Sequence, residues 1–161
     1  MKRRNFLALA GLAGAAAFVG RDLAAVEQKP GRADTVEKTD EEWRKLLTKE
    51  QYYVLREEGT EPPRSSPLDK QYGKGTYICA GCELPLFSSD TKFDSGTGWP
   101  SFYKPLPAAI ETKLDFKLIY PRTEYHCARC GGHQGHVFKD GPPPTGLRYC
   151  NNGLALKFVP A

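Results

Sequence analysis

The chain has 161 residues, enough for one domain with its own core, and a hydrophobic content of 40% excludes a disordered protein. The formal charge is +4, but residues 1–22 hold four basic residues and one acidic residue, which leaves +1 for the rest. A nearly neutral domain lacks the basic surface of a nucleic-acid-binding protein, so we expect no nucleic acid as a partner.

The N-terminus has the form of an export signal. Basic residues at positions 2–4 precede an uncharged run of small and apolar residues, 6–19, which is shorter than the about 20 residues of a membrane-spanning helix. Two arginines followed by Phe-Leu resemble a twin-arginine signal. We expect residues 1–25 to be a signal segment and residues 26–38 a linker. The expected location is the periplasm, or a membrane anchor if the signal is retained.

Two short helices are predicted at the start of the domain. Thr39 with Glu42, and Thr48 with Gln51, have the spacing of a capping box, in which Ser or Thr is followed three residues later by Glu or Gln. Hydrophobic residues at helical spacing follow each box, and Gly59 is expected to end the second helix. We expect both helices to pack on a sheet.

The rest of the domain has the pattern of short strands and turns. Frequent proline and glycine exclude long helices there. Apolar residues alternate with less apolar ones over residues 114–120, which predicts a strand broken by the proline that follows. Residues 147–150 and 154–159 flank Asn152-Gly153, and Asn-Gly predicts a hairpin between them. The predicted body is therefore antiparallel and mainly β.

Four of the five cysteines form two Cys-x-x-Cys pairs, Cys79 with Cys82 and Cys127 with Cys130. Two thiolates so close in sequence can reach one ion from a tight turn, and four complete the tetrahedron that suits zinc. Four protein ligands leave no open position for a substrate, so we predict one structural Zn²⁺ that staples the fold. Two disulfides, a redox-active pair or bound iron are the alternatives.

Cys150 is the cysteine outside these pairs. It ends a predicted strand two residues after Arg148, whose positive charge favours the reactive thiolate. His133 and His136 lie beside the second cysteine pair and can supply a proton donor. Trp99 follows a Gly-x-Gly sequence that can turn the backbone and present the indole ring to a substrate. The alternatives are an inert buried cysteine, hydrogen-bonded histidines and a core tryptophan.

Taken together, these motifs resemble the methionine-(R)-sulfoxide reductase family, MsrB. The matching segments are Gly-Trp-Pro-Ser-Phe at 98–102, both cysteine pairs, His-x-Gly-His-Val-Phe at 133–138 and Gly-Leu-Arg-Tyr-Cys at 146–150. The resemblance implies a catalytic domain over residues 39–161 with a mainly β fold of two antiparallel sheets. It also implies an oxidoreductase that reverses methionine oxidation for one of the two sulfoxide epimers.

The resemblance further implies a role for each site residue. Cys150 attacks the sulfoxide sulfur and ends as a sulfenic acid. His136 and His133 bind and protonate the departing oxygen, while Asn152 holds polar groups and Trp99 packs on the substrate's methyl group. The expected substrate is methionine sulfoxide in an oxidised protein or peptide. The expected reductant is a thioredoxin-like protein or a small thiol, and the expected state is a monomer.

Two positions depart from the family pattern. Thr97 stands where many members carry a second, resolving cysteine, so we expect an external thiol to reduce Cys150 directly. Gln134 stands where the family usually has leucine. Two other classes of function fit a lone cysteine and a metal staple: a cysteine-nucleophile hydrolase or acyltransferase, and a non-catalytic zinc-stapled binding module.

Overall fold

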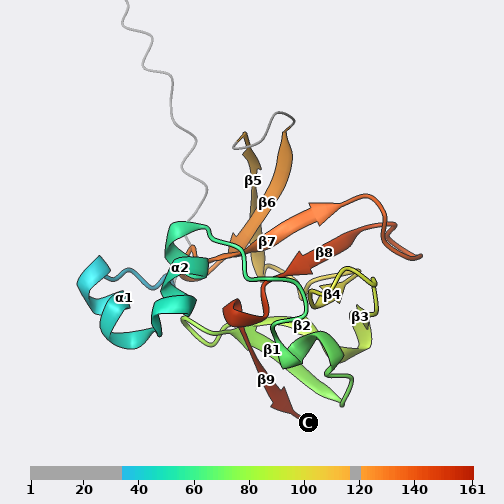
Figure 1. The fold of residues 1–161 in the computed structure, drawn as a ribbon, viewed down its shortest axis with the longest axis horizontal. Helices are drawn as coiled ribbons and strands as arrows, with labels where there is room; N and C mark the ends of the chain where they lie inside the picture. The colour runs from blue at the N-terminus through green and yellow to red at the C-terminus, as the bar shows by residue number, and fades with distance from the viewer. Residues whose placement is uncertain (1–33, 117–120) are drawn as a thin grey trace, which may run out of the picture. The chain divides into compact units, whose positions relative to one another are not determined.

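A computed structural model describes residues 34–116 and 121–161 of the protein. The predicted signal segment, residues 1–25, lies outside this part of the chain. Within the described ranges, two short helices precede nine strands in two antiparallel sheets (Figure 1). The predicted mainly β fold with N-terminal helices is thereby confirmed. No helix in these ranges is long and apolar enough to cross a membrane.

Both predicted capping boxes are present. The helices are α1 (Asp40–Leu46) and α2 (Lys49–Glu57). The Thr39 hydroxyl accepts a hydrogen bond from the Glu42 amide, and the Glu42 carboxylate accepts one from the Thr39 amide. The predicted stop at Gly59 is wrong by one residue, because Glu58 adopts the left-handed conformation with φ 56°. Gly59 packs against the Tyr53 ring, where a Cβ atom would lie within 2.3 Å of it.

The strands divide between a three-stranded and a six-stranded sheet. The smaller sheet has the order β2-β1-β9, formed by β1 (Gly75–Cys79), β2 (Pro85–Ser88) and β9 (Leu156–Pro160). The larger has the order β3-β4-β8-β7-β6-β5, formed by β3 (Lys92–Phe93), β4 (Ser101–Phe102), β5 (Ile110–Asp115), β6 (Arg122–Cys127), β7 (His133–Phe138) and β8 (Arg148–Asn151). Short 3₁₀ helices lie between α2 and β1 (η1, Pro67–Lys70), between β2 and β3 (η2, Ser89–Thr91) and between β8 and β9 (η3, Gly153–Ala155).

Buried aromatic rings join the two sheets. Phe87 of β2 stacks on Phe102 of β4 with ring centroids 4.2 Å apart, and Tyr77 of β1 meets Phe102 edge-on at 4.9 Å. All three side chains are fully buried. Pairs in these geometries contribute about 0.5–1.5 kcal/mol each beyond the area they bury. Because Phe102 also pairs with Tyr149 of β8, this core fixes the strand that carries Cys150.

The predicted hairpin around Asn152-Gly153 is wrong. β8 belongs to the larger sheet and β9 to the smaller one, and η3 carries the chain between them. A type I′ hairpin turn needs positive φ at Asn, whereas Asn152 has φ −70°. Long-range contacts override the local preference: the Asn152 side chain accepts a hydrogen bond from Glu61, and Gly153 approaches Ser66 so closely that a Cβ would lie within 2.0 Å of its hydroxyl.

Of the strand predicted over residues 114–120, residues 114 and 115 form the end of β5, and residues 117–120 lie outside the described part of the chain. Its apolar residues Leu114 and Phe116 are 63% and 70% exposed, whereas the aspartate between them, Asp115, is 6% exposed. At these three positions the charged side chain is buried and the apolar side chains are exposed, which is the reverse of the usual pattern. The cause is the partners of Asp115, which are described below.

Candidate active site

Cys150 and His136 lie side by side in the larger sheet. Cys150 of β8 pairs directly with His136 of β7 on one side and with Ser101 of β4 on the other. Residues directly opposite across antiparallel strands project from the same face. The strand register therefore brings the predicted nucleophile and the predicted proton donor to one face of the sheet.

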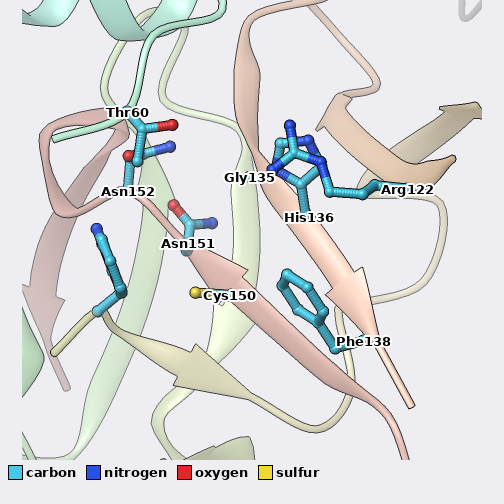
Figure 2. A pocket seen from close by; sticks show the side chains of 9 residues that line it. Thr60, Arg122, Gly135, His136, Phe138, Cys150, Asn151 and Asn152 are labelled. Atoms are coloured by element: carbon cyan, nitrogen blue, oxygen red, sulfur yellow. The ribbon is translucent and has the colours of Figure 1, made fainter. Parts of the chain in front are cut away.

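Both residues line a pocket of about 140 Å³ (Figure 2). Its lining residues are Thr60, Trp99, Arg122, Gly135, His136, Phe138, Cys150, Asn151 and Asn152. Four of the five residues predicted for catalysis and substrate binding are among them. The fifth, His133, is not.

His133 and His136 share a face although they are three residues apart. In a regular strand, residues three apart point to opposite faces. The register of β7 skips Gln134, because Gly135 and His133 pair with consecutive residues of β6. This β-bulge returns both imidazoles to one side of the sheet, with ring centroids 5.5 Å apart. The bulge is a feature that the spacing of the histidines did not reveal.

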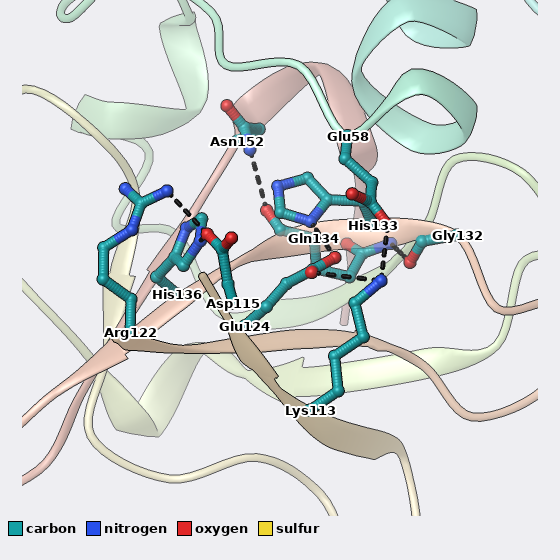
Figure 3. A network of polar contacts seen from close by, with 10 residues as sticks. All are labelled: Glu58, Lys113, Asp115, Arg122, Glu124, Gly132, His133, Gln134, His136 and Asn152. Atoms are coloured by element: carbon teal, nitrogen blue, oxygen red, sulfur yellow. Dashed lines mark hydrogen bonds and ion pairs between the residues drawn. The ribbon is translucent and has the colours of Figure 1, made fainter. Parts of the chain in front are cut away.

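His133 is buried behind the pocket wall, with 2% of its surface exposed. Its Nδ1 lies 2.7 Å from the Glu124 carboxylate, whose other oxygen lies 3.2 Å from the Lys113 ammonium (Figure 3). A carboxylate only accepts hydrogen bonds, so Nδ1 carries the proton and Nε2 is an acceptor. Burial lowers the pKa of His133, against the opposing effect of Glu124. The ring is therefore neutral at neutral pH.

His136 is held by the ion pair of the buried Asp115 with the partly exposed Arg122. Its Nε2 lies 2.9 Å from Asp115 Oδ2, which also accepts a hydrogen bond of 2.7 Å from Arg122 (Figure 3). These contacts explain why Asp115 is buried beside exposed apolar neighbours. Sequence reasoning missed Asp115, Arg122 and Glu124. A charged residue at a buried position can be recognised only when its partners on other strands are known.

The thiol of Cys150 is less acidic than an ordinary cysteine. Burial raises the pKa of Cys150, and this effect exceeds the lowering by Arg148 and by a hydrogen bond from Thr97. Arg148 favours the thiolate as expected, but burial of the thiol outweighs its effect on the pKa of Cys150. The Arg148 guanidinium is shared with Asp140, to which it donates two hydrogen bonds of 2.9 and 2.7 Å. The resting site holds a protonated thiol at neutral pH.

Glu61 connects Trp99 to Asn152, and sequence reasoning missed it as well. The Trp99 indole N–H donates to the Glu61 carbonyl at 3.1 Å, and the Glu61 amide donates to Asn152 Oδ1 at 3.0 Å. The Glu61 carboxylate, 3% exposed, accepts from the amides of Gly153 and Leu154 at 2.7 and 2.9 Å. The buried Glu61 therefore fixes the positions of Trp99 and Asn152, which both line the pocket.

The four remaining cysteines form a single cluster. Their sulfur atoms all lie within 4.8 Å of one another, with Cys79–Cys130 at 3.7 Å and Cys82–Cys127 at 3.4 Å. A zinc tetrahedron with Zn–S bonds of about 2.3 Å has sulfur–sulfur separations of roughly 3.8 Å, whereas a disulfide bond is about 2.05 Å long. The donor set and its spacing thus fit one tetrahedral metal ion. Because Cys79 ends β1 and Cys127 ends β6, such an ion joins the two sheets.

The fold and the site define a mainly β protein with a free thiol in a pocket and a separate cluster of four cysteines that can bind one metal ion. The SelR domain family matches residues 47–160. The chain is 56% identical over 126 residues to peptide methionine sulfoxide reductase MsrB of Agrobacterium fabrum (strain C58 / ATCC 33970), a match that covers 78% of this chain and 93% of the relative. It is 55% identical over 124 residues to the MsrB of Leptospira interrogans serogroup Icterohaemorrhagiae serovar Lai (strain 56601), covering 76% and 95%. The chain belongs to the SelR-domain, MsrB family, as the motifs predicted.

Proposed function

We propose that the protein is a peptide-methionine (R)-sulfoxide reductase that repairs oxidised proteins with Cys150 as nucleophile. The observation that carries the proposal is the pairing of Cys150 with His136 across β8 and β7, beside Trp99 in one pocket. Membership of the MsrB family supports the reaction class, because relatives at about 55% identity carry the name of this activity.

The proposed chemistry transfers one oxygen atom. The Cys150 sulfur attacks the sulfoxide sulfur, the S–O bond of the substrate breaks as the protonated oxygen passes to the Cys150 sulfur, and the products are methionine and a Cys150 sulfenic acid. The proton that the Cys150 thiol loses replaces the one given to the oxygen. Methionine sulfoxide is reduced by two electrons and Cys150 is oxidised by two. One external thiol then forms a mixed disulfide with Cys150 and releases water, and a second thiol restores Cys150 and leaves as an external disulfide.

Proton supply explains why histidines lie beside the thiol. The sulfoxide oxygen needs a proton as the S–O bond breaks, and His136 lies on the same face as Cys150 with its ring fixed by Asp115. The buried His133 ring packs against the His136 ring and helps to hold it in place. His136→Asn is expected to slow turnover about 10²–10⁴-fold. The matched control is His126→Asn, which changes a histidine outside the pocket and leaves turnover near that of the wild type.

The pocket volume suits the end of a side chain. At about 140 Å³ the pocket has room for the end of a side chain, such as a methyl sulfoxide group, and not for a whole folded segment. Trp99 and Phe138 supply apolar walls for the methyl group. A fixed wall on one side and a fixed proton donor on the other select one epimer of the sulfoxide.

The reductant is proposed to be external. Thr97, whose side chain opposes the rise in the pKa of the Cys150 thiol, stands at the position where many family members have a second cysteine. The other four cysteines lie together in the metal site, for which we propose one structural Zn²⁺. A thioredoxin-like protein or a small thiol then reduces Cys150. One zinc per chain, lost in Cys127→Ser, is the expected result of metal analysis.

The protein is also proposed to be exported by a twin-arginine route, on the pattern of residues 1–25. Replacing both arginines of the pair, Arg3 and Arg4, with lysine is expected to retain the protein in the cytoplasm. An unchanged periplasmic amount of this variant would contradict the route. The mass of the periplasmic protein shows whether the segment is removed or kept as an anchor.

The test of the proposed function uses separately prepared R and S sulfoxide epimers of blocked methionine with excess dithiothreitol. The expected result is reduction of the R epimer only, lost in Cys150→Ser. A cysteine hydrolase would instead turn over thioesters without consuming thiol, and a binding module would be insensitive to the substitution. Failure to reduce either epimer would contradict the proposal.

A further inference from the structure

Gln134 lies between the metal site and the reactive site and contacts both. It is the bulged residue of β7 and is fully buried. Its side-chain nitrogen lies 3.5 Å from the Cys79 sulfur, a normal length for a hydrogen bond to the large sulfur atom. Its main-chain carbonyl accepts two hydrogen bonds from Asn152, from the amide at 2.8 Å and from Nδ2 at 3.0 Å. Figure 3 marks the Asn152 contact.

The orientation of the Gln134 amide is determined by its neighbours. The group lies 3.5 Å from the Cys79 sulfur and 3.4 Å from the Gly132 carbonyl oxygen, and both of these are acceptors. The NH₂ end must therefore face them, because the oxygen end would meet only other acceptors. The Gln134 oxygen has no hydrogen-bond partner in the described part of the chain. The amide is thus held only at its NH₂ end, which faces the Cys79 sulfur and the Gly132 carbonyl oxygen.

A bound zinc ion would make this contact stronger. Four thiolates around one Zn²⁺ carry a net charge of −2, and N–H donors to the sulfur atoms offset it. Arg56 and Arg129 donate instead to the carbonyl oxygens of Cys130 and Cys82. Gln134 differs from them in contacting a sulfur atom itself.

We propose that Gln134 couples the metal site to the active site. Its side-chain N–H···S bond stabilises the metal-bound Cys79 thiolate, and through its main-chain carbonyl the same residue positions Asn152 beside Cys150. Gln134 is a positioning residue in this scheme, since it lines no part of the pocket. The effect on Asn152 rests on the proposed function. The contact with Cys79 does not rest on the reductase activity, but only on the metal ion proposed for the four-cysteine cluster.

The first test is spectroscopic and uses the intact, metal-loaded protein with ¹⁵N in its glutamine and asparagine side chains. Replacing Zn²⁺ with the larger Cd²⁺ is expected to shift the side-chain amide signals of Gln134 and Asn152. Gln71, whose amide oxygen accepts a hydrogen bond from Gly73, serves as the internal control and should not shift. A Gln134 signal that is the same with both metals would overturn the proposal.

The second test uses Gln134→Leu, which keeps the size of the side chain and removes the donor, with Gln71→Leu as the matched control. Zinc transfer to a chelator is expected to become at least about tenfold more favourable in Gln134→Leu and to remain unchanged in the control. The Asn152 shift on metal exchange should disappear as well. Equal zinc retention, or an undiminished Asn152 shift, would overturn the coupling. Neither readout needs turnover, so a negative result leaves the reductase proposal standing.

Discussion

The hydroxyl of Thr97 is predicted to tune the reactivity of Cys150, and Thr97→Val removes it with little change of shape. In the structure, burial raises the pKa of the Cys150 thiol while the Thr97 hydrogen bond opposes that rise. The loss of one hydrogen bond of about 0.5–1.5 kcal/mol lowers the thiolate population roughly 2- to 10-fold. We therefore expect Cys150 in Thr97→Val to be alkylated more slowly, by this factor, at neutral pH.

The assay is the rate of iodoacetamide alkylation of Cys150 as a function of pH, with the four other cysteines protected by bound zinc. Thr112→Val, in the exposed edge strand β5, is the matched control and should leave the rate unchanged. The midpoint of the pH profile should move upward in Thr97→Val. An unchanged midpoint, or a faster reaction, would refute the reasoning, because the hydroxyl would then not stabilise the thiolate.

Three further predictions concern stability. Phe87→Ala removes the fully buried ring that stacks on Phe102 and should cost about 3–5 kcal/mol in urea unfolding, and a cost below about 1 kcal/mol would contradict the inter-sheet core. Glu124→Gln replaces the charged partner of His133 and Lys113 and should cost about 1–2 kcal/mol, whereas the same change at the exposed Glu83 should cost about 0–0.5 kcal/mol. The pKa of His133 is lowered in the folded state, so the unfolded chain takes up a proton first as pH falls. Stability should therefore decline below about pH 6.5, and less steeply in His133→Asn; parallel pH curves would show that His133 is not the cause.

Features set by neighbouring residues could be predicted from the sequence. The capping boxes at Thr39 and Thr48 depend on residues three positions apart, and both are confirmed. The two cysteine pairs are equally local, and their meeting in one cluster follows from the geometry that a metal requires. The family motifs placed Cys150, His136 and Trp99 in one site, and the structure finds all three around one pocket.

Features set by distant residues could not be predicted. Asn152-Gly153 has the local signal of a hairpin, but Glu61, 91 positions earlier, takes the Asn152 side chain and directs the chain into the other sheet. The same holds for Asp115, whose burial depends on His136 and Arg122. The bulge at Gln134 likewise depends on the register with a second strand. In each case the deciding partner lies outside any local window of the sequence.

The central claim is that Cys150 itself takes the oxygen from methionine sulfoxide. A single-turnover reaction without reductant, with the R epimer of a blocked methionine sulfoxide, tests it most directly. The account predicts one equivalent of methionine per protein chain, together with a sulfenic acid at Cys150 that dimedone traps and peptide mass spectrometry locates. Methionine formed without modification of Cys150, or a trapped sulfenic acid at one of the metal-site cysteines instead, would contradict it.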